Sequence, residues 1–278
     1  MPAIHLGDNL AILPTIPPES VDLIYIDPPF NTGKARQAAR LKVTQDPDGD
    51  RTGFGGKRYK SEPISVHGFN DAIGDLHGFL APRIAIGRQL LKPTGSLFLH
   101  LDHHAVHHGR LMCDGLFGPN CFQNEIIWAY DYGGRGKRRW PAKHDNILWY
   151  TRDAQQYTFN HDAIDRIPYM APGLVGPEKA ARGKTPTDVW WHTIVPTSGR
   201  ERTGYPTQKP LGILNRIVAV HSNRGDLVLD YFGGSGTTGE AAWSQGRDYV
   251  LIDSNPDACR IMARRLAASG PKCFGFVP

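Results

Sequence analysis

Asp27-Pro28-Pro29-Phe30 and Asp230-Tyr231-Phe232-Gly233-Gly234-Ser235-Gly236-Thr237 are the two stretches that decide the fold. Each follows a short apolar run, residues 21–26 in the first case and 226–229 in the second. An apolar strand that ends in a polar loop is typical of α/β sheets, which place their chemistry at the carboxyl edge. Strands and helices alternate elsewhere, except in residues 133–205, which are rich in proline, glycine and tryptophan. The pattern predicts a largely parallel α/β sheet with an irregular insertion.

The glycines of the second stretch remove side chains where a strand turns into a helix. Backbone N–H groups and the positive end of the following helix can then approach a ligand. Asp253 ends the next predicted strand about twenty residues later, where an acid can bind a ribose diol. The phosphate-loop pattern G-x-x-x-x-G-K-[ST] does not occur, which disfavours a nucleoside triphosphate. The loop predicts a site for a nucleotide-like cofactor, and a purely structural turn is the alternative.

The first stretch can hold a flat ring that carries an amine. Such an amine is a poor nucleophile because its lone pair is delocalised into the ring, and hydrogen bonds accepted from both N–H groups localise that pair. The Asp27 carboxylate and the Pro28 carbonyl are two such acceptors, and the double proline keeps them rigid. Phe30 can stack on the ring. We therefore predict Asp27, Pro28, Pro29 and Phe30 as catalytic residues, with a simple strand-ending turn as the alternative.

The net charge of +5 is concentrated in two segments. Residues 34–60 hold eight Lys/Arg against three Asp, and residues 133–144 hold five Lys/Arg and no acid, so the remaining chain is acidic. Basic segments on an acidic body are typical of contacts to a polyanion, and solvated loops are the alternative. The second segment mixes cations with an aromatic side chain, which favours contact with DNA. The predicted DNA-binding residues are Arg135, Lys137, Arg138, Arg139, Trp140 and Lys143. Residues 31–68 lack periodicity and are predicted to form a long mobile basic loop.

Composition disfavours several other classes of protein. No run of 18 or more apolar residues occurs, which disfavours a membrane protein, and no secretory signal precedes the first strand. The four cysteines are scattered, which favours reduced thiols and a cytoplasmic location. A cluster of histidines has spacings that would allow them to bind a metal ion: His100, His103, His104, His107 and His108. No H-E-x-x-H pattern occurs, so we expect no metal site.

The two stretches resemble the motifs of the amino-group DNA methyltransferases that use S-adenosylmethionine. The Asp-Pro-Pro-Phe tetrad is similar to their catalytic motif, and the Phe-Gly-Gly-Ser-Gly loop is similar to their cofactor motif. The catalytic motif comes first here, which resembles the beta group, with a circularly permuted Rossmann-like sheet and target recognition between its halves. The resemblance implies a catalytic half in residues 1–132, a target-recognition insertion in 133–205 and a cofactor-binding half in 206–278. Tyr231 and Gly234 stand where proline and alanine are common, and Phe30 stands where tyrosine is more usual.

The resemblance also implies a cofactor site assembled from distant parts of the chain. Asp8 matches the acid that meets the cofactor adenine, and Asp253 matches the ribose-binding acid. Thr207 and Lys209 fall where the family holds the methionine tail. The full predicted set is Asp8, Asp27, Thr207, Lys209, Asp230, Phe232, Gly233, Gly234, Ser235, Gly236, Thr237, Thr238 and Asp253.

The implied reaction moves a methyl group from S-adenosylmethionine to adenine N6 of a base extruded from double-stranded DNA. An acid at the first position of the tetrad favours adenine over cytosine N4, for which serine is more common there. A homodimer and a cognate restriction enzyme are the partners that the resemblance suggests. Cytosine N4, RNA adenine and a protein glutamine amide are alternative acceptors. A DNA-binding protein without catalysis is the alternative from another class, whereas a nicotinamide enzyme would leave residues 27–30 unexplained.

Overall fold

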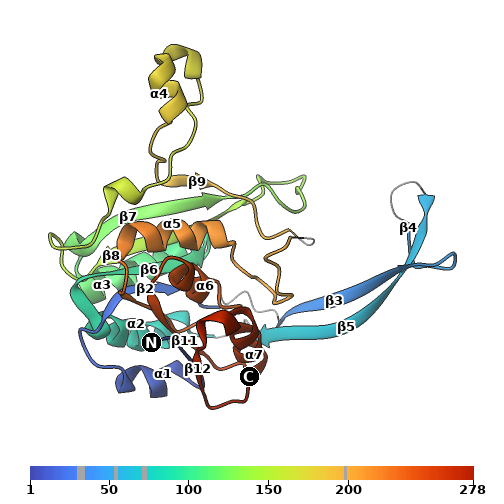
Figure 1. Cartoon of the computed structure of the whole chain (residues 1–278), viewed down its shortest axis with the longest axis horizontal. Coiled ribbons are helices and arrows are strands. Elements are labelled where there is room, and N and C mark those ends of the chain that lie inside the picture. Colours follow the sequence, from blue (N-terminus) through green and yellow to red (C-terminus); the bar gives the residue numbers. More distant parts are fainter. Residues whose placement is uncertain (30–34, 53–55, 71–73, 197–198) are drawn as a thin grey trace.

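A nine-stranded sheet forms the centre of the molecule, with helices on both of its faces (Figure 1). The computed structural model describes residues 1–29, 35–52, 56–70, 74–196 and 199–278, with the backbone alone for 35–43, 51 and 61–70. Six neighbouring strands are parallel. In spatial order they are β12 (Lys272–Phe274), β1 (Ala3–Leu6), β11 (Asp248–Asp253), β10 (Leu227–Asp230), β2 (Val21–Ile26) and β6 (Leu91–Asp102). The predicted parallel α/β fold is confirmed.

Three further strands extend the sheet beyond β6. They are β8 (His144–Thr151), which is antiparallel to β6, followed by β7 (Phe122–Ala129) and β9 (Val189–Trp191). Residues 146–151 of β8 are all buried, so this strand belongs to the core of the sheet. β8 and β9 come from the segment predicted to be an insertion. Part of that segment is therefore paired with the sheet, and its role as a target-recognition insertion stays a prediction.

The helices form one layer on each face of the sheet. On one face lie α5 (Leu211–His221), α6 (Thr237–Ser244) and α7 (Pro256–Arg265), and on the other α1 (Asn9–Ile12), α2 (Leu76–Leu90) and α3 (Val106–Phe117). All six residues of β2 are buried, as expected for a parallel strand covered on both sides. A short helix, α4 (Pro177–Arg182), lies in an excursion away from the sheet (Figure 1). None of the helices in the described ranges has the length and hydropathy that a membrane crossing requires.

A long ribbon projects from the body of the molecule (Figure 1). It consists of β3 (Ala35–Gln45) and β5 (Arg58–Asn70), which pair antiparallel, with β4 (Arg51–Thr52) beside β5. Residues 31–68 were predicted to be a loop, and that prediction is wrong for the described part. The strands are stabilised by backbone hydrogen bonds between distant residues, which leave little trace in local periodicity.

β10 occupies the middle of the sheet although it comes late in the chain. It pairs with β11 on one side and with β2 on the other. The buried carboxylate of Asp22 fixes this junction, because it accepts a hydrogen bond from Leu227 N (2.9 Å) and pairs with the Lys92 ammonium (2.8 Å). The order of strands reverses between β10 and β2, and open α/β sheets bind ligands at such a point. The loops that follow these two strands are the two stretches that decide the fold.

Candidate active site

A cavity of about 1230 Å³ opens between the loops that follow β2 and β10. Its glycine-loop wall consists of Asp230, Phe232, Gly233, Gly234, Ser235, Thr237, Thr238, Asp253, Ser254, Asn255 and Pro256. Its Asp27 wall consists of Tyr25, Asp27, Pro28, Pro29, Asp102, His103, Trp128, Tyr130, Tyr132, Ala142 and Asp145. Residues 205–209 line the cavity between the two walls. A drug-sized ligand occupies roughly 300–1,000 Å³, so this cavity has room for more than one.

The glycine-loop wall presents main chain to the cavity. Gly234 and Gly236 have φ angles of +50° and +78°, a region that side chains rarely adopt. A Cβ atom at Gly236 would lie 3.0 Å from the Met262 Cγ atom. The turn therefore depends on glycine for its conformation and for its close packing against α7.

Two acids of this wall have both carboxylate oxygens hydrogen-bonded. Asp253 accepts from the N–H groups of Gly234 and Asn255, each at 2.8 Å. Asp230 accepts from Phe232 N at 2.9 Å and from the Thr238 hydroxyl at 2.6 Å. Burial raises the pKa of Asp253 and raises that of Asp230 to about 7. Such acids suit a ligand that brings hydroxyl donors and positive charge.

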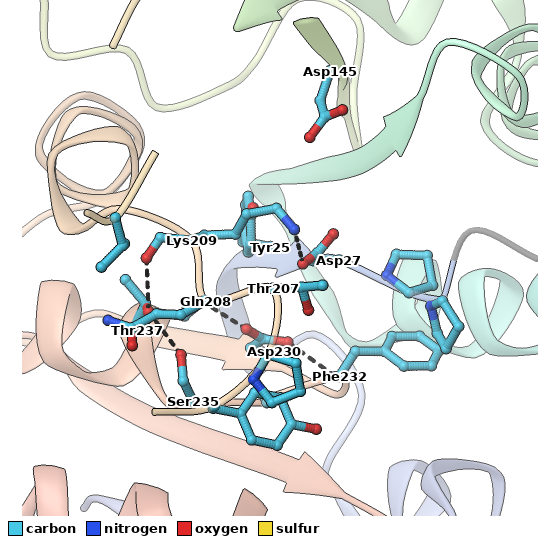
Figure 2. Close-up of a pocket in the computed structure, with 18 of the residues that line it drawn as sticks. Tyr25, Asp27, Asp145, Thr207, Gln208, Lys209, Asp230, Phe232, Ser235 and Thr237 are labelled. Carbon is cyan, nitrogen blue, oxygen red and sulfur yellow. Dashed lines mark hydrogen bonds and ion pairs between the residues drawn. The ribbon is translucent and has the colours of Figure 1, made fainter. Parts of the chain in front are cut away.

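Asp27 is held differently. It follows β2 at the carboxyl edge, and its Oδ2 atom pairs with the Lys209 ammonium (Figure 2). The two side chains are 18% and 10% exposed. The other oxygen, Oδ1, is buried and has no hydrogen-bond partner among the described residues. Pro28 and Pro29 line the cavity beside it, whereas the predicted catalytic residue Phe30 lies outside the described residues.

A chain of buried polar side chains backs the Asp27 wall. The Tyr25 hydroxyl lies 2.7 Å from His100 Nδ1, and His100 Nε2 lies 3.2 Å from Asp145 Oδ2. The Tyr130 hydroxyl donates to Asp145 Oδ1 at 3.1 Å. Sequence reasoning missed Tyr25, Tyr130 and Asp145 as site residues. For Asp145, the available sequence signal was its place at the polar start of β8. Because β8 is antiparallel to β6, it begins at the carboxyl edge of the sheet, where β6 ends.

Lys209 belongs to a segment that is fixed by its own hydrogen bonds. Its carbonyl accepts from the Thr237 hydroxyl at 3.1 Å, and the neighbouring Gln208 donates to Glu201 O at 2.7 Å. Thr207 has a φ angle of +58°, which is uncommon for a residue with a side chain. The predicted residues Thr207 and Lys209 both line the cavity, but the Lys209 ammonium lies on Asp27.

Two of the predicted cofactor residues do not line the cavity. The Asp8 carboxylate accepts from Leu10 N at 3.0 Å, at the start of α1, and pairs with Arg83 at 3.1 Å. Gly236 lies at the start of α6, where its conformation lets the helix begin. The other predicted cofactor residues are brought together at the cavity.

The predicted DNA-binding segment joins β7 to β8 beside the cavity. Tyr132 and Ala142, near its two ends, line the Asp27 wall. The predicted residues Arg135, Lys137, Arg138, Arg139 and Trp140 are exposed, and Trp140 is 96% exposed. Arg135 pairs with Asp131 at 2.6 Å, and Lys143 donates to the backbone carbonyl of Gly134 at 3.0 Å. The segment therefore offers exposed cations next to the cavity.

The histidine cluster divides between the core and the surface. His100 is fully buried, whereas His107 and His108 are exposed on α3. The ligand atoms of Asp102, His103 and His104 lie within 4.8 Å of one another. Asp102 Oδ1 already accepts hydrogen bonds from the N–H groups of His104 and Ala105, at 3.1 and 2.9 Å. These bonds stabilise the turn between β6 and α3, which accounts for the acid at this position.

Comparisons with known proteins agree on one family. A family model described as DNA methylase matches residues 21–264. The DNA adenine methyltransferase YhdJ of Escherichia coli (strain K12) is 32% identical, over 95% of this chain and 81% of that protein. The crystal structure of the M1.HpyAVI-SAM complex is similar with a TM-score of 0.61 and 21% identity, covering 96% of this chain and 99% of that one. PvuII DNA methyltransferase (cytosine-N4-specific) is similar with a TM-score of 0.65 and 15% identity, covering 94% and 85%.

Proposed function

The chain belongs to the DNA methylase family, and we propose that it transfers a methyl group from S-adenosylmethionine to adenine N6 in double-stranded DNA. The observation that carries the proposal is the Asp27 carboxylate beside Pro28 in a cavity with room for a donor and a base. An acid in this position, rather than serine, favours adenine as the target. The relative at 32% identity is named as an adenine methyltransferase, which supports the same choice.

The glycine-loop wall fits the methyl donor. S-adenosylmethionine supplies a methyl carbon bound to a cationic sulfur that leaves as a neutral thioether. Asp253 would accept hydrogen bonds from the ribose hydroxyls, and the main chain that lines the cavity at Gly233 and Gly234 would let a nucleoside approach closely. Asp230 lies behind this loop, and the positive charge of the bound ligand would favour the ionised form of its carboxyl group. Thr207 would contact the methionine tail.

The Asp27 wall would prepare the acceptor. Asp27 and the Pro28 carbonyl would each accept one N–H of the amine, which localises the nitrogen lone pair for attack on the methyl carbon. As the new N–C bond forms, the amine gains positive charge and must lose one proton, for which Asp27 is a suitable acceptor. The prolines keep both acceptors in place. Phe30 is proposed as the stacking partner of the extruded base, on the sequence motif alone.

The basic segment and the excursion around α4 are proposed to contact DNA. Exposed Arg138, Arg139 and Lys137 beside the cavity would neutralise phosphates, and Trp140 would contact a base or sugar. Residues 133–205 are the proposed target-recognition part of the chain, and within them residues 152–188 lie between β8 and β9, outside the sheet. Homodimerisation and a cognate restriction enzyme remain proposals that rest on the family resemblance, and a cytoplasmic location remains a proposal that rests on the scattered cysteines.

Nucleoside analysis of plasmid DNA from cells that express the protein tests the reaction. N6-methyladenine is the expected product, and its absence together with N4-methylcytosine would establish the alternative acceptor. Incubation with RNA or protein in place of DNA tests the remaining acceptors. A protein that binds DNA but neither binds nor consumes labelled S-adenosylmethionine would be a non-catalytic DNA-binding protein.

A further inference from the structure

Neither oxygen of Asp27 is open to an incoming amine in this structure. Oδ2 pairs with the Lys209 ammonium, and Oδ1 is buried without a partner among the described residues. The proposed function requires Asp27 to accept an N–H of the target base. Something beside Asp27 must therefore move before methyl transfer, and this inference rests on the proposed function.

Lys209 is the group that can move. The Asp27 backbone is fixed between the last residue of β2 and the Pro28-Pro29 pair. The Lys209 backbone is fixed as well, because its carbonyl accepts from Thr237 and Pro210 begins α5. The lysine side chain, in contrast, carries its ammonium on a flexible four-carbon stem. The ammonium can swing while both backbones stay in place.

A largely buried ammonium needs another anion when it leaves its first partner. Asp145 lines the same cavity, and Figure 2 shows its carboxylate pointing into the cavity from the side opposite Asp230, toward the place where Lys209 and Asp27 meet. The Asp145 side chain is 13% exposed. No step of the proposed reaction uses this acid otherwise.

Asp145 is built to stay ionised at this position. His100 and Tyr130 hold one oxygen each, which fixes the carboxylate without neutralising it. Burial raises the pKa of the Asp145 carboxyl, but the hydrogen bond and charge of His100 and the charge of Lys209 lower it, and the net shift is downward. A fixed, ionised acid that faces the cavity can receive a cation without rearranging the sheet.

We propose that Asp145 is the second counter-ion of Lys209. It receives the ammonium when the target amine takes Asp27, and the ammonium returns to Asp27 when the methylated base leaves. Lys209 thus covers Asp27 in the free enzyme and leaves it in the enzyme–DNA complex. Asp145 acts through Lys209, so it is a positioning residue.

The test compares Asp145→Asn with wild type on unmethylated DNA that contains the site at which the wild-type enzyme acts. At saturating DNA and S-adenosylmethionine, the single-turnover methylation rate is expected to fall about 10- to 100-fold, the effect of one charge-assisted hydrogen bond. The dissociation constant of S-adenosylmethionine is expected to stay within about twofold of the wild-type value. Asp145 lies outside the proposed donor site, and substitutions at separated sites have independent effects on free energy. In a Lys209→Met background, Asp145→Asn is expected to cause no further loss, since no ammonium remains to be received.

Asp114→Asn is the matched control, because Asp114 is also held by a tyrosine hydroxyl (Tyr150, 2.6 Å) and by a cation (Arg110, 3.0 Å), but outside the cavity. Its variant is expected to lose thermal stability and to keep the methylation rate. If Asp145→Asn does not fold, a structure of wild type with DNA and the demethylated donor decides the matter. Lys209 Nζ is then expected within about 4 Å of Asp145.

Two results overturn the inference. One is an Asp145→Asn enzyme with the wild-type rate, and the other is Lys209 found on the carboxylate of the donor or still on Asp27 in the complex. A wild-type enzyme that forms no N6-methyladenine would instead refute the proposed function, so the two failures are distinguishable.

Discussion

The two walls of the cavity hold their acids by different means. On the glycine-loop wall, Asp230 and Asp253 accept hydrogen bonds from main-chain N–H groups and from the Thr238 hydroxyl. On the Asp27 wall, Asp27 pairs with the flexible ammonium of Lys209. A main-chain donor stays in place unless the loop unfolds, whereas a lysine can exchange its partner. One wall is thus preorganised, as the proposed donor site requires, and the other has an exchangeable ion pair, as the proposed base site requires.

Replacing the acid of the exchangeable wall is expected to have the largest effect. Asp27→Asn keeps the size of the side chain but removes its charge, and the methylation rate is expected to fall about 100- to 1,000-fold. Binding of S-adenosylmethionine should change little, because the contacts proposed for it lie on the glycine-loop wall and at Thr207, not on the Asp27 wall. Single-turnover rates and calorimetric titration measure the two quantities. If the affinity for S-adenosylmethionine fell by as much as the methylation rate, the two walls would not have separate roles.

Removing an acid of the preorganised wall should have the opposite signature. Asp253→Ala is expected to weaken S-adenosylmethionine binding about 10- to 100-fold, because it removes the proposed ribose contacts and the hydrogen bond from Gly234 N. DNA affinity should remain at the wild-type level. Asp248→Ala, at the other end of β11, is the control and should affect neither ligand. A loss of DNA affinity in Asp253→Ala would contradict the comparison.

The buried Asp230 of the glycine-loop wall makes the stability of the protein depend on pH. Burial raises its pKa to about 7, so the folded protein binds a proton that the unfolded chain releases near pH 4. The resulting stabilisation is complete below about pH 4 and is lost as the pH rises through about 7. The melting temperature of the ligand-free protein is therefore expected to fall by several degrees between pH 5 and pH 8. Asp230→Asn should flatten that fall, which thermal scans at several pH values will check; an unchanged slope would mean that another group titrates.

The smallest effect is expected in the basic segment that continues the exchangeable wall. Arg138→Ala should weaken DNA binding about fivefold and lower the slope of log affinity against log salt by about 1, with donor binding unchanged. Arg135→Ala is the matched variant, and its effect should be smaller because Asp131 already pairs with Arg135. Fluorescence titrations at several salt concentrations compare the two. Equal slopes for both variants and wild type would argue against phosphate contact.

The sequence was sufficient for the parts of the site that follow strands. Asp27 and Asp230 each end an apolar run, and the carboxyl ends of parallel strands meet at one edge, so their proximity could be predicted. Asp145 could not be found in this way, because it begins an antiparallel strand and carries no motif of its own. Its proposed role depends on His100 and Tyr130, which are brought to it by the pairing of β8 with β6 and β7.

Two other differences have physical reasons as well. Asp8 matches the family motif in sequence, but the start of α1 and Arg83 take its carboxylate away from the cavity lining. The ribbon of β3 and β5 was predicted to be a loop, because residues 31–68 are rich in Gly, Lys, Arg and Asp and show little periodicity. Its register joins Ala35 to Asn70, and no local signal reports so distant a pairing.

The position of β10 has a consequence for how the protein is made. This strand lies between β2 and β11, yet a ribosome adds residues 227–230 only after more than two hundred others. Until then one edge of β2 lacks its partner strand β10. The early strand β1 lacks its partner β11, which comes even later in the chain. Assembly of the sheet must wait for the late residues, so long-range contacts dominate its folding. A nascent or prematurely terminated chain that lacks β10 therefore has no complete cavity.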